Sequence, residues 1–161
     1  SVLCVWLDVP EMDRCGPADD CWDRDRVVAK VEQEEQARTT FVLPLASIIE
    51  TGNHIAQARH SRWERAQALA DLMHKSAQRE SPWAAFSEQS GLWSKEQLKV
   101  LAQTWPALAA QKLSLGDATI KDVADFYAQM GCQVEILTGD AGLKKYEPQV
   151  PAAIPRRRQR L

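Results

Sequence analysis

The chain has 161 residues and a mass of 18.1 kDa, and 45% of its residues are hydrophobic and 26% charged. This composition is typical of one soluble globular domain and excludes a disordered, collagen-like or coiled-coil chain. No apolar run approaches the roughly 18 residues of a membrane-spanning helix, so we expect no membrane partner and a cytoplasmic protein. The 20 Lys and Arg against 22 Asp and Glu give a net charge of -2, which argues against nucleic-acid binding through an overall positive field.

The first 38 residues are predicted to hold a short apolar element and a longer helix. Residues 2–7 are apolar without alternation, and form either a buried strand or the start of a short helix. A polar stretch follows, in which Pro10, Gly16 and Pro17 predict turns. Residues 24–38 carry valines at helical spacing, so we expect a one-sided amphipathic helix there.

A strand followed by a helix is predicted next. Residues 39–43 are β-branched and apolar, which favours a short buried strand. Pro44 stands where the following helix would begin, because proline is favoured in the first helical turn. The apolar face of this helix is formed by Leu45, Ile48, Ile49 and Ile55.

The second half of the chain is predicted to be helical up to a final strand. Residues 61–112 have helical character, with breaks at Pro82, Gly91 and Pro106. Another helix ends at Met130, with a glycine just past its end, and residues 132–138 predict a strand that leads into a turn. Because strands alternate with helices, we expect an α/β fold whose central parallel sheet is covered by helices on both faces.

Three acids are predicted at or near strand ends. Asp140 follows the last strand, Glu50 lies in the helix after residues 39–43, and Asp117 opens the helix that leads into the last strand. Functional groups of parallel α/β sheets gather at the carboxyl ends of the strands. Acids brought together there repel each other unless cations hold them, so such a cluster indicates a Mg²⁺ or Mn²⁺ site with oxygen ligands.

Each acid also has a purely structural interpretation. Asp117 can be the N-cap of its helix, and Asp140 can close a turn with its side chain. Glu50 lies opposite the apolar stripe of its helix, where helical period alone favours a solvated glutamate. His54, one turn further on, is either a general base or a hydrogen-bonded bystander.

The cysteines and the basic C-terminal end suggest few specific roles. The four cysteines lack CxxC and CxxH spacing, so we expect buried free thiols rather than a zinc site. Residues 148–161 form a Pro- and Arg-rich tail, either a solvated tail or a source of phosphate contacts to a substrate through Arg156, Arg157 and Arg158.

Three stretches resemble the acidic motifs of PIN-domain ribonucleases: FVLPLASIIE at 41–50, GDATI at 116–120 and VEILTGDAGL at 134–143. In that family a strand leads through Pro or a small residue into a helix with the second acid. The third acid starts a helix that ends at Gly, and the next strand ends in Thr-x-Asp. The order and spacing agree over most of residues 24–146.

The resemblance implies a three-layer α/β/α domain over residues 1–147, with extra helices inserted at about 61–112. It implies that Glu50, Asp117 and Asp140 are catalytic and bind Mg²⁺ or Mn²⁺, directly or through water, and that Thr138 orients one of them. The metal would activate a water for in-line attack on the phosphodiester of an RNA.

The beginning of the chain departs from the family pattern, in which a hydrophobic strand ends in Asp followed by Thr or Ser and then an apolar run. If residues 2–7 are that apolar run, the first strand and its acid lie upstream of Ser1. The alternative makes residues 2–7 the strand and Asp8 the acid. The first interpretation is favoured, because no hydroxyl residue directly follows Asp8 and Gly16-Pro17 would interrupt the next helix.

The main functional hypothesis is a metal-dependent endoribonuclease, either a toxin of a toxin–antitoxin pair or a prokaryotic defence effector. Its expected partners are an RNA substrate, an antitoxin or other protein, and a second copy in a homodimer. The alternative is a catalytically inactive scaffold that binds RNA or protein through the basic tail and tryptophans such as Trp83, Trp93 and Trp105. A flavodoxin-like phosphate-responsive domain also has acids at strand ends, but fits less well.

Overall fold

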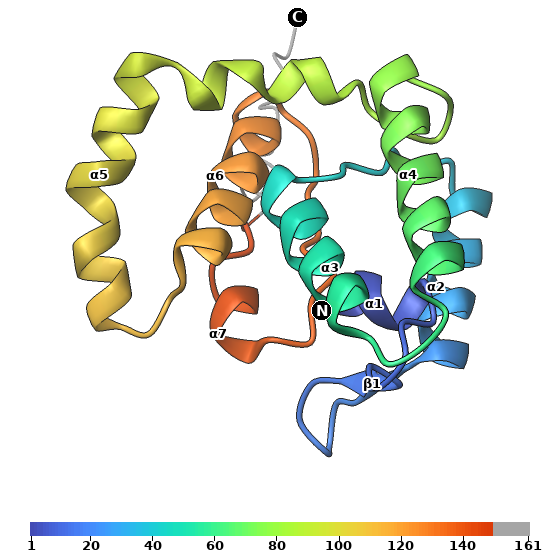
Figure 1. The fold of residues 1–161 in the computed structure, drawn as a ribbon. Helices are drawn as coiled ribbons and strands as arrows, with labels where there is room; N and C mark the ends of the chain where they lie inside the picture. The colour runs from blue at the N-terminus through green and yellow to red at the C-terminus, as the bar shows by residue number, and fades with distance from the viewer. Residues whose placement is uncertain (150–161) are drawn as a thin grey trace, which may run out of the picture.

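The computed structural model describes residues 1–149, which are mostly helical (Figure 1). Two short strands, β1 (Arg14–Cys15) and β2 (Trp22–Asp23), form an antiparallel ribbon. None of the helices in this part of the chain has the length and apolar character needed to cross a membrane. The helices are α1 (Val2–Trp6), α2 (Arg24–Gln36), α3 (Leu45–Gln57), α4 (Arg62–Gln78), the 3-10 helix η1 (Phe86–Trp93), α5 (Lys95–Ala110), α6 (Leu115–Gln129) and α7 (Ala141–Lys144).

The prediction of an α/β fold with a central parallel sheet is wrong. Within residues 1–149 the ribbon of β1 and β2 is the only sheet, and it is antiparallel. The three-layer α/β/α domain implied by the resemblance is therefore not the architecture of the described chain, which is helical with one small ribbon. Residues 39–43 and 132–138, the two predicted strands, lie outside any helix or sheet.

The reason is that neither segment has a strand beside it. Phe41 makes one isolated parallel bridge to Trp83, and the ladder goes no further. The backbone of Ile136 is hydrogen-bonded by side chains instead: its N–H donates to Glu147 and its carbonyl oxygen accepts from Lys144. A strand-forming sequence makes a sheet only where a neighbouring strand supplies the ladder of backbone hydrogen bonds.

The predicted helices are confirmed at α2, α3 and α6, and local sequence explains their ends. The Asp23 side chain caps α2 by accepting a hydrogen bond from the Arg26 N–H. Pro44 is the N-cap of α3, in extended conformation. Gly131 follows α6 with a φ of 88°, the left-handed conformation that glycine adopts without strain. Pro106 was expected to break the chain but lies within α5, so that prediction is wrong.

The hydrophobic core has one part around α1 and another along α6. Residues 2–7 begin with helix α1, so the strand interpretation is wrong. Val2, Cys4 and Val5 of this helix are buried. The Trp6 ring stacks on Trp83 with centroids 6.2 Å apart. Helix α3 packs against α1, α4 and α6, and thereby joins the N-terminal and C-terminal parts of the core (Figure 1).

The tryptophans proposed as anchors for a partner differ in exposure. Trp83 is 8% exposed and lies between Trp6 and Phe41, so it is a core residue and not an anchor. The ring nitrogen of Trp105, which is half-buried, donates to the carbonyl oxygen of Leu113. Trp93 is 43% exposed, and it stays the best candidate of the three for contact with a partner.

Candidate functional site

A cavity of about 2040 Å³ lies between residues 39–44 and residues 132–141. Helices α1 and α2 line part of its wall, and α3 and α6 line another part. Glu50, Asp117 and Asp140 all line this cavity. The three acids predicted from the sequence come from three separate elements, and the structure places all of them on the lining of this cavity.

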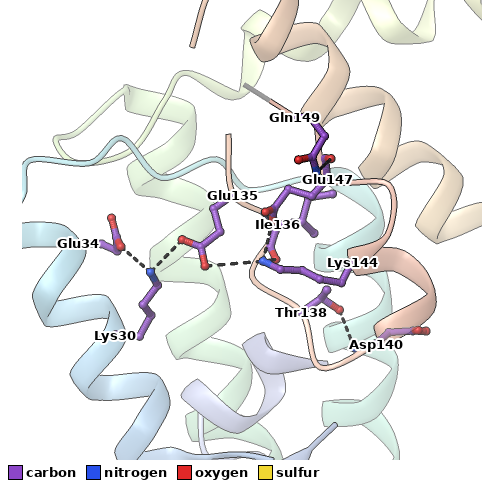
Figure 2. Close-up of polar contacts among 9 residues, drawn as sticks. All are labelled: Lys30, Glu34, Glu135, Ile136, Thr138, Asp140, Lys144, Glu147 and Gln149. Atoms are coloured by element: carbon purple, nitrogen blue, oxygen red, sulfur yellow. Dashed lines mark hydrogen bonds and ion pairs between the residues drawn. The ribbon is translucent and has the colours of Figure 1, made fainter. Parts of the chain in front are cut away.

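Asp140 is held by the backbone of the turn that carries it. Its Oδ1 accepts hydrogen bonds from the N–H groups of Gly142 at 2.6 Å and Leu143 at 3.3 Å, which caps α7. The hydroxyl oxygen of Thr138 accepts from the Asp140 N–H at 3.0 Å (Figure 2). The predicted turn is confirmed, and Thr138 does contact the residue that follows it by two positions. Its hydroxyl fixes the backbone from which the carboxylate projects.

Asp117 lies in the first turn of α6, and Ser114 is the N-cap in its place. The Ser114 hydroxyl oxygen accepts from the Asp117 N–H at 3.0 Å and its proton is donated to Asp117 Oδ2 at 2.6 Å. The prediction that Asp117 is the N-cap is therefore wrong by three positions. This reciprocal pair resembles a capping box and leaves Oδ1 of Asp117 without a hydrogen bond among residues 1–149.

Glu50 is an exposed residue of α3 whose side chain reaches the cavity. Its Oε1 lies 3.9 Å from Nε2 of His54, one turn along the helix. His54 does not line the cavity, so the structure does not bring this histidine to the three acids. Of the two interpretations left open for His54, the contact with Glu50 favours the bystander.

The three acids offer oxygen ligands but do not converge on one point. Within residues 1–149, no group of three His, Cys, Asp or Glu side chains is close enough to hold a metal ion. Mg²⁺ needs fewer protein ligands than this, because proteins usually bind it through one or two carboxylates together with waters and substrate phosphates. Asp117 and Asp140 each have one carboxylate oxygen free of hydrogen bonds in this part of the chain. The donor chemistry of the cavity therefore fits a hard divalent cation.

Asp8 is separate from these acids. Its carboxylate pairs with Arg65 of α4, and it does not line the cavity. The alternative in which Asp8 is the first acid of the site is therefore wrong. The predicted substrate contacts of Arg156, Arg157 and Arg158 lie outside the described residues.

An ion-pair network borders the cavity and was not predicted from the sequence (Figure 2). Lys30 Nζ of α2 donates to Glu34 at 2.6 Å and to Glu135 at 2.8 Å. The hydrogen bonds to Glu135 and then to Glu34 raise the pKa of Lys30. Glu34 also accepts from the Thr39 hydroxyl. Side chains of α2 thus contact both predicted strand segments, at Thr39 and at Glu135.

The network continues to the end of the described chain. Lys144 Nζ donates to Glu147 at 2.6 Å and to the Ile136 carbonyl oxygen at 3.0 Å, and lies 3.7 Å from Glu135. The carboxylate of Glu147 accepts from the Ile136 N–H at 2.7 Å. Only the spacings of Lys30 with Glu34 and of Lys144 with Glu147 could have signalled any of this in the sequence, because the contacts with Glu135 and with the Ile136 backbone join residues further apart in the chain.

The turn before Asp140 touches the ribbon at two glycines. A Cβ atom on Gly139 would lie 2.8 Å from the backbone nitrogen of Gly16 and 2.9 Å from Sγ of Cys15. Gly16 itself has a φ of 95°. The backbones can approach this closely only because residue 139 has no side chain. The ribbon thereby limits where the Asp140 turn can lie.

The cysteines are all free thiols, as predicted, but they differ in burial. Cys4 is fully buried and its thiol donates to the hydroxyl oxygen of Thr51 at 3.8 Å, whereas Cys132 is exposed. Burial raises the pKa of Cys4 and of Cys15. These thiols are therefore poor nucleophiles at neutral pH. The prediction that all four are buried holds only for Cys4, because Cys15 and Cys21 are half-buried and Cys132 is exposed.

In comparisons with known proteins, no family model, no curated protein and no solved structure matches this chain.

Proposed function

We propose that the chain is a metal-dependent endoribonuclease that hydrolyses RNA phosphodiester bonds at the cavity lined by Glu50, Asp117 and Asp140. The observation that carries this proposal is that three carboxylates, from α3, α6 and the α7 turn, line one cavity. The resemblance of their sequence surroundings to acidic motifs of PIN-domain ribonucleases supports it.

The chain's own groups would bind the cation and present the phosphodiester to it. Glu50, Asp117 and Asp140 supply carboxylate oxygens, directly or through water. The Asp140 carboxylate needs little reorganisation, because two backbone N–H groups already fix it. A bound Mg²⁺ or Mn²⁺ supplies Lewis acidity, which favours ionisation of a bound water and neutralises charge on the phosphodiester. Without a cation the same acids would repel RNA.

The test is RNA cleavage by the full chain with Asp117→Asn or Asp140→Asn. Asparagine keeps the shape of aspartate and can keep the hydrogen bonds that cap α6 and α7, so the fold should persist. We expect each variant to lower the cleavage rate at least about 100-fold, because the charge that holds the cation is lost. Cleavage of a labelled single-stranded RNA is measured against Mg²⁺ and Mn²⁺ concentration.

Asp122→Asn is the matched control, since Asp122 lies on the same helix as Asp117 but does not line the cavity. It should cleave RNA at the rate of the unaltered chain. Cleavage that survives both Asp117→Asn and Asp140→Asn, or that persists in EDTA, would contradict the proposal.

A catalytically inactive scaffold is the second candidate, and one observation favours it. No three acids within residues 1–149 converge closely enough to hold a metal ion. A scaffold would bind RNA or protein without cleaving it, and its affinity would not change with Asp117→Asn. Binding of RNA with no cleavage at any Mn²⁺ concentration would favour the scaffold over the enzyme.

We further propose that the protein works in the cytoplasm as the toxin of a toxin–antitoxin pair or as a defence effector. The four free thiols support a reducing compartment, because disulfides are rare there. The exposed Trp93 is a candidate contact for an antitoxin or a second copy. Arg156, Arg157 and Arg158 are proposed to contact RNA phosphates.

A further inference from the structure

The cavity combines an excess of negative charge with apolar walls. Its lining includes seven acidic and three basic side chains, a net charge of -4. Val27 and Val31 of α2 and Ile120 and Val123 of α6 supply apolar surface beside these charges. The volume of about 2040 Å³ exceeds the roughly 300–1,000 Å³ of a small-molecule pocket. An occupant that suits this cavity is therefore larger than a small ligand, cationic in one part and apolar in another.

The three acids of the candidate site lack a lysine or arginine partner. Within residues 1–149, neither Asp117 nor Asp140 forms an ion pair, and Glu50 approaches only His54. The acids of the lining that do pair with a lysine or arginine are Glu34, Glu88 and Glu135. Carboxylates without counter-ions repel one another, and a guanidinium group relieves this repulsion with charge-assisted hydrogen bonds. The three unpaired acids therefore favour arginine side chains in the occupant.

The arginines that could pair with these acids are concentrated in the sequence after residue 149. Four of the chain's 20 Lys and Arg lie at positions 156–160, so the remaining 16 are set against all 22 Asp and Glu. The six residues before them, Val-Pro-Ala-Ala-Ile-Pro at 150–155, carry no charge. Residues 150–158, called the basic segment below, thus join an apolar half to three consecutive arginines. Their charge and apolar character are complementary to the lining of the cavity.

The two prolines of the basic segment favour its burial without a neighbouring strand. Pro151 and Pro155 carry no backbone N–H, so the apolar half has fewer donors that need a partner in an apolar site. Proline also fixes φ near -65°, which reduces the conformational entropy that is lost on binding. The apolar half can therefore lie against apolar walls without the hydrogen-bond ladder of a sheet.

The described chain leads to the border of the cavity just before the basic segment. The Glu147 carboxylate accepts from the N–H of Ile136, which lines the cavity, and the Gln149 side chain donates to the Glu147 carbonyl oxygen (Figure 2). Asp140 is four residues from Ile136, at most about 14 Å along the chain. Residues 150–156 span about 22 Å in the extended conformation that proline favours. The basic segment is therefore long enough to bring its arginines to the Asp140 carboxylate.

We propose that the basic segment occupies this cavity in its own chain. Its apolar half lies against α2 and α6, and its three arginines pair with the carboxylates of Glu50, Asp117 and Asp140. The arginines then take the place of a metal ion and cover the surface on which RNA would bind, a consequence that rests on the proposed function. RNA phosphates would draw the arginines away from the acids, because phosphate and carboxylate compete for guanidinium groups.

Tryptic cleavage within positions 156–158 tests this docking in the full chain. A segment that is bound about 90% of the time is cleaved about 10-fold more slowly than a free one. We expect Asp117→Asn combined with Asp140→Asn to speed the cleavage at least about 5-fold, because the arginines lose two of their three charged partners. Asp19→Asn combined with Asp122→Asn is the control, since it removes the same charge from residues that do not line the cavity, and it should leave the rate unchanged.

A chemical cross-link identifies the carboxylates that the segment contacts. Arg157→Lys keeps the charge and introduces an amine that a carbodiimide couples to a carboxylate in contact with it. We expect mass spectrometry to find position 157 joined to Glu50, Asp117 or Asp140. The yield should fall at least about 5-fold in 1 M NaCl, where the Debye length is about 3 Å. Lys95 of α5 is the internal control, because it is exposed and does not line the cavity, so it should not be coupled to these acids.

Three outcomes would overturn the proposal. An unchanged tryptic rate in the variant with Asp117→Asn and Asp140→Asn would show that the segment does not bind these acids. Cross-links from position 157 to carboxylates all over the surface would show a solvated segment without a defined site. Cross-links only between two chains, with a yield that rises with protein concentration, would assign the cavity to a second copy. Both readouts are made without RNA or a divalent cation, so the docking and the proposed nuclease can each fail independently.

Discussion

The two segments that border the cavity are held in place by different forces. Residues 39–43 are anchored by a backbone bridge to Trp83 and by Leu43, which is 3% exposed. Residues 132–138 are anchored by Ile136, which is 6% exposed and packs with Ala124 and Leu143, and also by ionised side chains, with Lys144 and Glu147 on the backbone of Ile136. Apolar burial depends little on pH and salt, whereas partly exposed ion pairs depend on both.

This difference shows how two walls of one cavity can differ in local stability. We expect the wall at residues 39–43 to open only when the core unfolds. The wall at 132–138 should open locally, at a lower free energy, because the ion pairs that hold its backbone are partly exposed to solvent. The following predictions test that contrast.

The largest effect is expected for Trp83→Ala. The substitution removes a ring that stacks on Trp6 and meets the Phe41 ring edge-on at 5.5 Å, and it leaves a void beside residues 39–43. We expect the free energy of unfolding to fall by about 4 kcal/mol, measured by urea denaturation. Trp63→Ala is the control, since Trp63 is 72% exposed on α4, and it should change stability by less than about 0.5 kcal/mol. Similar losses in both variants would contradict the role of Trp83.

A smaller and local effect is expected for Lys144→Met. The substitution removes the ammonium group that contacts Glu135, Glu147 and the Ile136 carbonyl oxygen, but the side chain is 42% exposed, so solvent replaces part of these contacts. We expect a loss of about 1 kcal/mol. Amide exchange should become faster at Ile136 and stay unchanged at Phe41. Lys145→Met, at an exposed residue without an ion pair among residues 1–149, should change neither amide.

The smallest effect is a pH dependence that involves both walls through Glu34. Hydrogen bonds from Lys30 and then from the Thr39 hydroxyl lower the pKa of Glu34 below its ordinary 4.5. A carboxylate whose pKa is lowered by folding stabilises the fold above the ordinary value, and this stabilisation is lost as pH falls through the lowered pKa. We therefore expect stability to decrease below about pH 4.5.

Glu34→Gln tests this origin of the acid sensitivity. The variant should be slightly less stable at pH 7 and should show a shallower decrease between pH 5 and 3, measured by denaturation at each pH. An unchanged slope would assign the acid sensitivity to other carboxylates.

Sequence reasoning located the helices because their signals are local. Pro44 precedes α3 and Gly131 follows α6. Proline favours a helix start and glycine a helix end through the conformation of their own backbone, so both signals act within a few residues. The sheet could not be predicted in this way, because it depends on whether another strand lies beside Phe41 or Ile136. Residues 132–138 have the composition of a strand and adopt an unpaired path.

The candidate site was only partly predicted, because local sequence signals do not determine how elements distant in the chain pack together. Glu50, Asp117 and Asp140 were expected near one another, and they do line one cavity. Their failure to converge depends on helix positions that no local motif determines. The same holds for the contacts of Lys30 with Glu34 and Glu135, whose partners are separated by 105 residues in the longer case.

The contact between Gly139 and the ribbon also has a consequence for which sequences can form this molecule. Any side chain at position 139 would collide with the backbone of Gly16, which cannot move away without displacing β1. In a library that samples every amino acid at both positions, we expect glycine alone to survive at 139 and to dominate at 16. A single pair of backbones in contact would thus restrict mutational tolerance more severely than any of the three acids does for folding.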